Sequence, residues 1–244
     1  MSLEPRRALV TGGAGAIGSA ICRRLARDGL FVYVQVREAR EEAHALVHEL
    51  QSLGAGAELL AFDLTDAGAC EHVLAQALCA GPVQVLVNNA AVHDDAAFPA
   101  MQPQQWQRVL DVSLLGFFHV TRTVLLPMIR TRWGRIISMS SVAALKGNRG
   151  QVNYAAAKGA INAATRALAL EVATRGITVN AVAPGIIATP MSAPSFDAAA
   201  IERLVPMQRA GSSEEVAELA GFLASEAAGY ITGQVISING GMYL

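Results

Sequence analysis

The sequence predicts a single α/β domain built on a doubly wound parallel sheet of about seven strands, with helices on both faces. Short β-branched runs alternate with longer amphipathic segments along the chain. The runs are continuously apolar rather than alternating, which is typical of strands that are buried on both faces. Neither a linker nor an internal repeat interrupts the alternation, so we expect residues 1–244 to form one domain.

The predicted strands are short apolar runs. In chain order they read RALVT, FVYVQV, ELLAF, VQVLV, GRIISM, ITVNAVA and GQVISI. The first predicted helix runs from Ile17 to Gly29, where the glycine ends it. We expect right-handed crossovers between the strands. Residues 188–213, which are rich in Pro, Ser and Ala and follow a strand end, are predicted to form a mobile lid over a substrate site.

Composition narrows the class of protein. Of the 244 residues, 52% are hydrophobic and 16% charged, and the formal net charge is -1, so nucleic acid and membrane are not expected as partners. The chain shows no signal peptide and no uninterrupted apolar run of about 18 residues. Cys22, Cys70 and Cys79 lack metal-ligand spacing, which favours reduced thiols over disulfides or zinc. We therefore expect a soluble cytoplasmic protein without a metal site.

A glycine-rich turn lies between the first predicted strand and the first helix, in ALVTGGAGAIGSAI. A helix N-terminus and free backbone amides at such a turn can receive a pyrophosphate. A glycine cluster alone could be a tight turn, but the order strand, turn, helix favours dinucleotide binding. The candidate cofactor residues in this turn are Gly12, Gly13, Ala14, Gly15, Ile17 and Gly18.

The end of the second strand bears on the choice of cofactor. A carboxylate there would hold the ribose 2′-hydroxyl of NAD, but Val36 and Arg37 occupy the position. The planar fork of an arginine matches the oxygens of the 2′-phosphate of NADP, and Arg40 can assist. A solvated surface charge is the alternative reading of Arg37. We predict NADP(H) as the cofactor.

Polar or glycine-bearing loops follow the later strands as FDLTD, VNNAA, SMSSV and APGIIAT. Ligands of open α/β sheets bind outside the carboxyl ends of the strands. We expect Asp63 and Leu64 to flank an adenine, and Asn88, Asn89 and Ala90 to run beside a ribose. The last of these loops contributes the candidate cofactor residues Pro184, Gly185, Ile187 and Thr189.

The segment YAAAK carries Tyr154 and Lys158 four residues apart on an alanine-rich helix, so both side chains lie on one face. The alanines leave that face open to a bulky ligand. One reading is an ordinary solvent-facing pair. The other is a phenol whose pKa, ordinarily about 10, is lowered by the neighbouring ammonium.

These motifs together resemble the short-chain dehydrogenase/reductase family. TGGAGAIG, NNAA, the serine pair before YAAAK, and PGIIATPM carry the resemblance, which extends over essentially the whole chain. It implies a Rossmann-type fold, hydride transfer with a nicotinamide, and a catalytic set of Ser141, Tyr154 and Lys158. In that set Tyr154 supplies a proton, Lys158 lowers the pKa of its phenol and reaches the cofactor ribose, and Ser141 holds the carbonyl oxygen.

The sequence departs from the family pattern at three positions. The fourth catalytic position, usually an asparagine that holds a relay water, is Ser113. A central glycine of the phosphate loop is Ala16, which is tolerated if its φ stays negative. The loop also has Gly15 where NADP-using relatives often carry a basic residue, which weakens the argument for NADP.

Within the family, GRIISMSSVAALKGNRGQVNYAAAKGA and the C-terminal segment are similar to bacterial β-ketoacyl-acyl-carrier-protein reductases. This resemblance implies NADPH-dependent reduction of a 3-oxoacyl chain on acyl carrier protein to the 3-hydroxyacyl form, in fatty-acid or polyketide/polyene-type synthesis. It further implies a homotetramer, and it assigns Arg132 and Arg175 to docking of the carrier protein. The alternatives are an NAD(P)-dependent dehydrogenase of a free secondary alcohol or ketone, and a non-catalytic nucleotide-binding protein.

Overall fold

The sheet is parallel throughout, as the sequence predicts. The computed structural model describes residues 5–190 and 197–244 and contains one sheet in that part of the chain, with the strand order β3-β2-β1-β4-β5-β6-β7. Its strands are β1 (Arg7–Val10), β2 (Phe31–Val36), β3 (Ala57–Ala61), β4 (Val83–Asn88), β5 (Gly134–Met139), β6 (Ile177–Pro184) and β7 (Val235–Ile238).

The order of the strands reverses beside β1. Chain order runs outward through β2 to β3 on one side and from β4 to β7 on the other. Val10 of β1 lies level with Val34 of β2 and with Val87 of β4, so the ends of the three strands stay together. A reversal of this kind opens a crevice at the carboxyl ends of the strands, where ligands of open α/β sheets bind.

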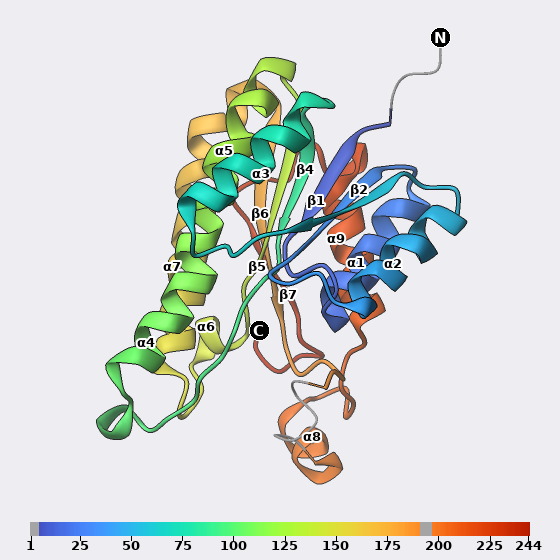
Figure 1. Cartoon of the computed structure of the whole chain (residues 1–244). Helices are drawn as coiled ribbons and strands as arrows, with labels where there is room; N and C mark the ends of the chain where they lie inside the picture. The colour runs from blue at the N-terminus through green and yellow to red at the C-terminus, as the bar shows by residue number, and fades with distance from the viewer. Residues whose placement is uncertain (1–4, 191–196) are drawn as a thin grey trace.

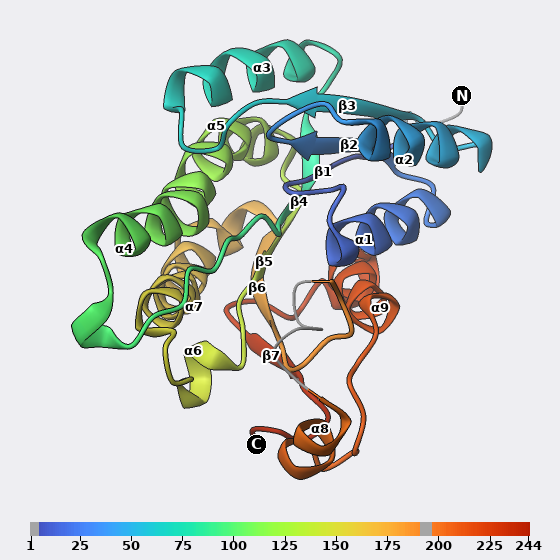
Figure 2. The same cartoon turned by 60° about the horizontal axis from the view of Figure 1, so that its bottom comes forward.

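Helices cover both faces of the sheet (Figures 1 and 2). One face carries α1 (Ala16–Arg27), α2 (Glu41–Ser52) and α9 (Ser213–Ala224). The other carries α3 (Ala67–Cys79), α4 (Pro103–Leu110), α5 (Gly116–Thr131) and α7 (Val152–Val172). Two short helices, α6 (Ala143–Lys146) and α8 (Ala198–Leu204), lie at the carboxyl-end edge of the sheet. The remaining short turns are η1 (Phe98–Ala100), η2 (Asp111–Leu115), η3 (Ala173–Arg175) and η4 (Glu226–Ala228).

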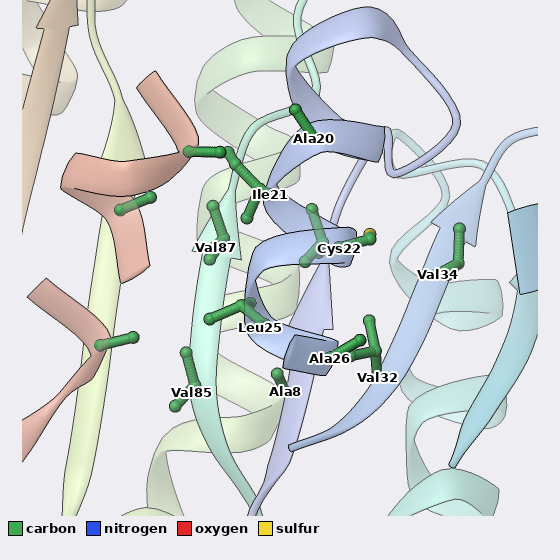
Figure 3. Packing of buried hydrophobic residues seen from close by; sticks show 14 of the residues in the cluster. Ala8, Ala20, Ile21, Cys22, Leu25, Ala26, Val32, Val34, Val85 and Val87 are labelled. Atoms are coloured by element: carbon green, nitrogen blue, oxygen red, sulfur yellow. The ribbon is translucent and has the colours of Figure 1, made fainter. Parts of the chain in front are cut away.

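Successive residues of a central strand point into opposite core layers. In β1, Ala8 and Val10 belong to the layer under α1, α2 and α9, whereas Leu9 belongs to the layer under α3, α5 and α7. Figure 3 shows the first layer, where Ile21 and Leu25 of α1 pack over β1 and β4. This two-sided burial explains why the strands read as continuous apolar runs.

The helix predicted over residues 17–29 forms as α1 and ends at Arg27. Gly29 follows with a φ of 82°, a left-handed conformation that glycine adopts without strain. At the other end, Gly15 is the N-cap and has no side chain to cap the helix. The first amides of α1 are thus left to a ligand or to water.

By length and composition alone, the continuous helical segment Pro103–Thr131 is apolar enough to cross a membrane. Its Val109, Val120, Val124 and Met128 are each fully buried within the protein. In its most apolar window, 33% of the residues are buried inside the protein. A core helix of a globular domain can have the same composition, so one such helix is weak evidence of a membrane span.

Only part of the predicted lid can be described. Residues 191–196 of the interval 188–213 lie outside the described residues. Helix α8 lies within the described part of this interval. Its N-cap residue is Asp197, whose side chain accepts a hydrogen bond from the Ala200 amide. The far end is joined to the loop after β6, where Ala188 donates to the Gly211 carbonyl oxygen at 2.9 Å.

Candidate active site

The glycine-rich turn forms a cradle that side chains would fill. Gly12 has a φ of 61°. A Cβ on Gly18 would lie 2.3 Å from the carbonyl oxygen of Gly12, and one on Gly13 would lie 2.8 Å from Val34. Together with the uncapped N-terminus of α1, this tight turn presents backbone amides to an anion. Among the described residues, positive φ outside glycine occurs only at Arg132 and Gln208, so Ala16 fits its position without strain.

A buried glutamine that sequence reasoning missed holds this turn in place. The Gln35 side chain, 1% exposed at the end of β2, accepts a hydrogen bond from the Gly12 amide at 3.0 Å. Its amide group donates to the Phe62 carbonyl oxygen after β3 at 2.8 Å. One side chain thereby joins the ends of three strands. The only signal in the sequence was a lone amide inside the apolar run FVYVQV.

The loop after β4 is joined to the turn by reciprocal hydrogen bonds. The Thr11 hydroxyl oxygen accepts from the amides of Asn89 and Ala90 at 2.9 and 3.0 Å. The Asn89 side chain donates back to the carbonyl oxygens of Thr11 and Gly12. Asn88 instead donates to the Thr121 hydroxyl of α5 at 3.1 Å, which directs it into the helical layer. The structure therefore brings Asn89 and Ala90, but not the Asn88 side chain, to the glycine turn.

Arg37 follows β2, as expected, and its side chain is 64% exposed. It does not stand alone, because Glu38 lies 3.2 Å from Arg37 and 2.7 Å from Arg40. The hydrogen bond from Arg40, aided by the charge of Arg37, lowers the pKa of the Glu38 carboxyl. The three side chains form an exposed cluster with one excess positive charge, in which Glu38 competes with any phosphate for the two guanidinium groups.

The loop after β3 is fixed by side chains on both sides. The amide and hydroxyl of Thr65 both donate to the Asp63 carboxylate at 2.8 Å, and chiefly the amide bond lowers the pKa of that carboxyl. The carbonyl oxygen of Leu64 lies 2.9 Å from Nδ1 of His119 on α5. His119 was not expected from the sequence. The Asp63 carboxylate and the buried Leu64 are therefore held in fixed positions beside the crevice.

The segment Pro184 to Thr189 leaves β6 beside the C-terminal strand. A Cβ on Gly185 would lie 2.8 Å from the Cα of Asn239, so only glycine allows the two backbones to approach. Ile187 forms an isolated bridge with Gly211, which ties this loop to the start of α9. The loop lies at the same edge of the sheet as Ser141.

Ser141, Tyr154 and Lys158 come together as the sequence predicts. Ser141 follows β5, and its hydroxyl accepts a hydrogen bond from the Ala143 amide at 3.1 Å. The Tyr154 phenol hydrogen-bonds with Ser141. Lys158 is 2% exposed; its Nζ donates to the Met139 carbonyl oxygen at 2.7 Å and lies 5.7 Å from the centre of the Tyr154 ring.

The electrostatics of this pair differ from the expectation. Burial raises the pKa of the Tyr154 phenol; the hydrogen bond from Ser141 opposes the rise and the Asp95 carboxylate adds to it. Burial also lowers the pKa of the Lys158 ammonium to about 8. In the protein without cofactor the net shift of the phenol pKa is therefore upward, because desolvation disfavours the charged form of each group. The lowering of the phenol pKa by Lys158 stays a prediction.

Ser113 lies in the π-helical turn η2 between α4 and α5 and is 5% exposed. Its hydroxyl has no hydrogen-bond partner among the described residues. It lines an internal cavity of about 10 Å³ together with Lys158, Asn88 and Ser138. A cavity of that size accommodates about one water molecule. The structure thus places Ser113 beside Lys158, where the family comparison expects a relay group.

A larger cavity, of about 260 Å³, opens beside Tyr154. One wall is apolar and includes Ile186, Ile187, Leu204 and Met242. The opposite wall is polar and comes from the segments after β4 and before α7, with the residues His93, Asp95, Asn148 and Gln151. Ser141 and Tyr154 also line this cavity, so a ligand held in it would contact the catalytic side chains.

Arg132 and Arg175 lie together, but away from this cavity. Arg132 ends α5 in a left-handed conformation with a φ of 52° and donates to the Thr174 carbonyl oxygen at 3.0 Å. Both arginines precede strands, β5 and β6, and so lie at the amino ends of the sheet. Helix α7 separates this end from Tyr154, and its 21 residues span about 30 Å.

Comparison with known proteins agrees with this geometry. The sequence model of the short chain dehydrogenase family matches residues 6–200. A 3-oxoacyl-[acyl-carrier-protein] reductase of Aggregatibacter actinomycetemcomitans is 43% identical, covering 96% of this chain and 98% of its own. Nodulation protein G of Azospirillum brasilense is 42% identical over 98% and 99% of the two chains. An acetoacetyl-CoA reductase of an Acinetobacter species is also 42% identical, over 99% of each chain. With the dinucleotide cradle and the Ser–Tyr–Lys site already in place, these matches show that the chain belongs to the short-chain dehydrogenase/reductase family.

Proposed function

We propose that this oxidoreductase uses NADPH to reduce a 3-oxoacyl chain carried on acyl carrier protein to the 3-hydroxyacyl form. The observation that carries the proposal is that Ser141 and Tyr154 line a cavity with apolar residues, at the same carboxyl-end edge of the sheet as the glycine-rich turn. The relatives named for reduction of 3-oxoacyl-carrier-protein and of acetoacetyl-CoA support a 3-oxo thioester as the substrate.

The residues of the chain suit a reduction. A bound nicotinamide would supply hydride to the ketone carbon. Ser141 would donate to the carbonyl oxygen, which stabilises the charge that develops there. Tyr154 would deliver the proton, and its raised pKa keeps the phenol protonated in the free protein. Lys158, with a pKa of about 8, is mostly an ammonium at neutral pH and would stabilise the phenolate left after transfer.

The choice of NADP over NAD rests on the exposed cluster after β2. Arg37 and Arg40 together outweigh Glu38 by one positive charge. A 2′-phosphate carries more negative charge than a ribose hydroxyl and would draw both guanidinium groups away from the carboxylate. The backbone amides of the glycine turn would hold the pyrophosphate in either cofactor, so selectivity depends on this cluster.

The test of the function is cofactor oxidation measured at 340 nm with three substrates of equal acyl length. The 3-oxoacyl chain is presented on acyl carrier protein, on coenzyme A, and as a free ketoester. We expect the highest kcat/KM on the carrier protein. A preference for coenzyme A would favour the second candidate, an acetoacetyl-CoA reductase, which the Acinetobacter relative supports. Turnover of free secondary alcohols alone would refute reduction of thioesters altogether.

The carrier-docking part of the proposal requires a second copy of the chain. Arg132 and Arg175 lie at the amino ends of the strands, whereas the cavity lies at the carboxyl ends, with α7 between them. A carrier protein on these arginines would therefore serve the cavity of another subunit, which agrees with the proposed homotetramer. We also propose that the protein is located in the cytoplasm.

Charge reversal tests this docking. Arg132→Glu and Arg175→Glu should each lower kcat/KM on the carrier-bound chain, by a factor that shrinks as salt rises, and leave the free ketoester unaffected. Arg27→Glu, an exposed arginine in the opposite helical layer, is the control and should change neither. Equal losses on both substrates would indicate damaged folding, and no loss on either would remove these arginines from docking.

A further inference from the structure

The polar lining of the larger cavity includes a chain of hydrogen bonds that ends on the Asp95 carboxylate, and a histidine lies beside that carboxylate. The Asn148 side chain donates to the Gln151 side-chain oxygen at 2.9 Å. Gln151 in turn donates to the Asp95 carboxylate at 2.8 Å. The other oxygen of Asp95 lies 3.3 Å from Nδ1 of His93. The two hydrogen bonds fix the Asp95 carboxylate, and its free oxygen is placed to attract the Nδ1 side of the imidazole.

The two segments that carry this chain are also joined through the backbone. The Ala96 amide donates to the Gly150 carbonyl oxygen at 2.9 Å. Asn153 adds a second link, since its side chain donates to the Asp94 carbonyl oxygen at 2.9 Å. The wall is therefore held along its length, although the side chains of His93 and Asp95 are 39% and 42% exposed. Half-exposed ion pairs contribute little stability, so orientation of the ring is the effect that this network can supply.

The position of the ring relates it to the substrate. His93 lines the same cavity as Ser141 and Tyr154, which would hold the oxygen of the reacting ketone. Because Nδ1 faces Asp95, the nitrogen Nε2 is the one available to a ligand. Only in a protonated ring do both nitrogens donate, Nδ1 to Asp95 and Nε2 to an acceptor, so the contact proposed below belongs to the protonated form of His93. The apolar residues of the lining offer no donor side chain to the substrate, and Lys146 is the cationic side chain that lines the cavity besides the histidine.

We propose that His93 is a specificity-determining residue that binds a second carbonyl oxygen of the substrate, the one separated by a single carbon from the reacting ketone. In a 3-oxoacyl chain this is the thioester carbonyl. The inference rests on the proposed function and deepens it: His93 makes the enzyme selective for 1,3-dicarbonyl compounds over isolated ketones. Asp95, Gln151 and Asn148 act as positioning residues that aim the ring.

The same geometry explains why an acidic side chain is tolerated beside the proton donor. The Asp95 carboxylate adds to the rise in the Tyr154 phenol pKa that burial causes, and a bare carboxylate would repel an electron-rich carbonyl oxygen. With one oxygen bound to Gln151 and the other facing His93, its charge is directed into the wall. The cavity then presents to the ligand a nitrogen of the ring rather than a carboxylate.

The test compares two substrates that differ in one group. The first is the 3-oxobutanoyl thioester of N-acetylcysteamine, and the second is the matching ketone in which a methylene replaces the thioester carbonyl. Each variant is compared with the wild type on both, so the lower intrinsic reactivity of the isolated ketone cancels. His93→Phe removes the donor, and His93→Gln keeps one in similar space. Asp95→Asn keeps the shape of the partner and removes its charge.

We expect His93→Phe to lose about 10-fold in kcat/KM on the thioester, the worth of one hydrogen bond, mainly through KM, and to stay close to wild type on the isolated ketone. His93→Gln should recover most of the loss, and Asp95→Asn should fall between the two. Equal losses of His93→Phe on both substrates, or none on either, would overturn the proposal. If the wild type itself reduces the ketone but never the thioester, the proposed function fails instead, whatever His93 does.

Discussion

Gln35 should matter to cofactor binding although it would not touch the reacting atoms. We consider Gln35→Met, which keeps the length of the side chain and removes both hydrogen bonds. The change leaves the Phe62 carbonyl oxygen and the Gly12 amide without this partner. Each buried group left unpaired costs about 1–3 kcal/mol. Gly12 is only partly buried, so water can replace one bond, and the expected loss of unfolding free energy from the other is about 1–3 kcal/mol.

Two measurements check this reasoning. Denaturant unfolding gives the loss of stability, and quenching of protein fluorescence on titration with NADPH gives the dissociation constant. We expect NADPH to bind at least about 10-fold more weakly to Gln35→Met, since the glycine turn loses the contact that sets its distance from β2 and β3. Val32→Ala, a change in the same strand that removes apolar core contacts, is the control and should lose stability with little loss of affinity. If Gln35→Met bound NADPH as the wild type does, Gln35 would be a core residue without influence on the turn.

Five further changes, at four positions, test individual roles. Tyr154→Phe should lower kcat by about 10²–10⁴-fold, the usual cost of losing a general acid, and leave NADPH affinity largely intact; retention of a tenth of the rate would contradict its role. Arg37→Asp should shift preference toward NADH, and unchanged KM for both cofactors would make Arg37 a surface residue. Ser113→Asn should keep or raise activity, while Ser113→Ala should cost less than Tyr154→Phe; an equal cost would mean that the serine acts directly. Asp95→Asn should lower the phenol pKa, because the carboxylate raises it, so the alkaline fall of the reduction rate should begin at lower pH; a shift to higher pH would contradict this.

The fold could be predicted from the sequence because its determinants are local. Strands buried on both faces must be apolar throughout, so each of the predicted runs became a strand of the sheet. The glycine turn could be predicted for the same reason. A turn that has no room for a Cβ at Gly18 requires glycine at that position, and glycines are visible in the sequence. Tyr154, Lys158 and Ser141 could be found only because their pattern resembles a known family; the spacing of Tyr154 and Lys158 alone was also consistent with an exposed pair.

Contacts between distant segments could not be predicted. From the sequence alone, Gln35 is a polar residue in an apolar strand with no evident partner. The fold supplies the partners, because the loops after β1 and β3 place Gly12 and Phe62 beside it. His93 reads as a loop residue until the turn before α7 brings Gln151 to Asp95. The partners of Gln35, and the contact between Gln151 and Asp95, join residues more than 20 positions apart in the sequence. Hydrophobic periodicity contains no information about such contacts.

The Tyr154–Lys158 pair shows the same limit in its electrostatics. Spacing predicts that the two side chains share a helix face, and they do. Whether the ammonium lowers the phenol pKa depends on how deep the face is buried, because desolvation acts against both charges. Here burial lowers the pKa of Lys158 to about 8 and raises that of Tyr154, so the free protein holds a neutral phenol beside a readily deprotonated lysine. A neutral phenol is the form that donates a proton, which suits reduction. The reverse reaction needs the phenolate, and the positive charge of an oxidised nicotinamide is what would then favour it. Burial therefore shifts the pKa of both groups away from their ordinary values, which the spacing of the two residues could not reveal.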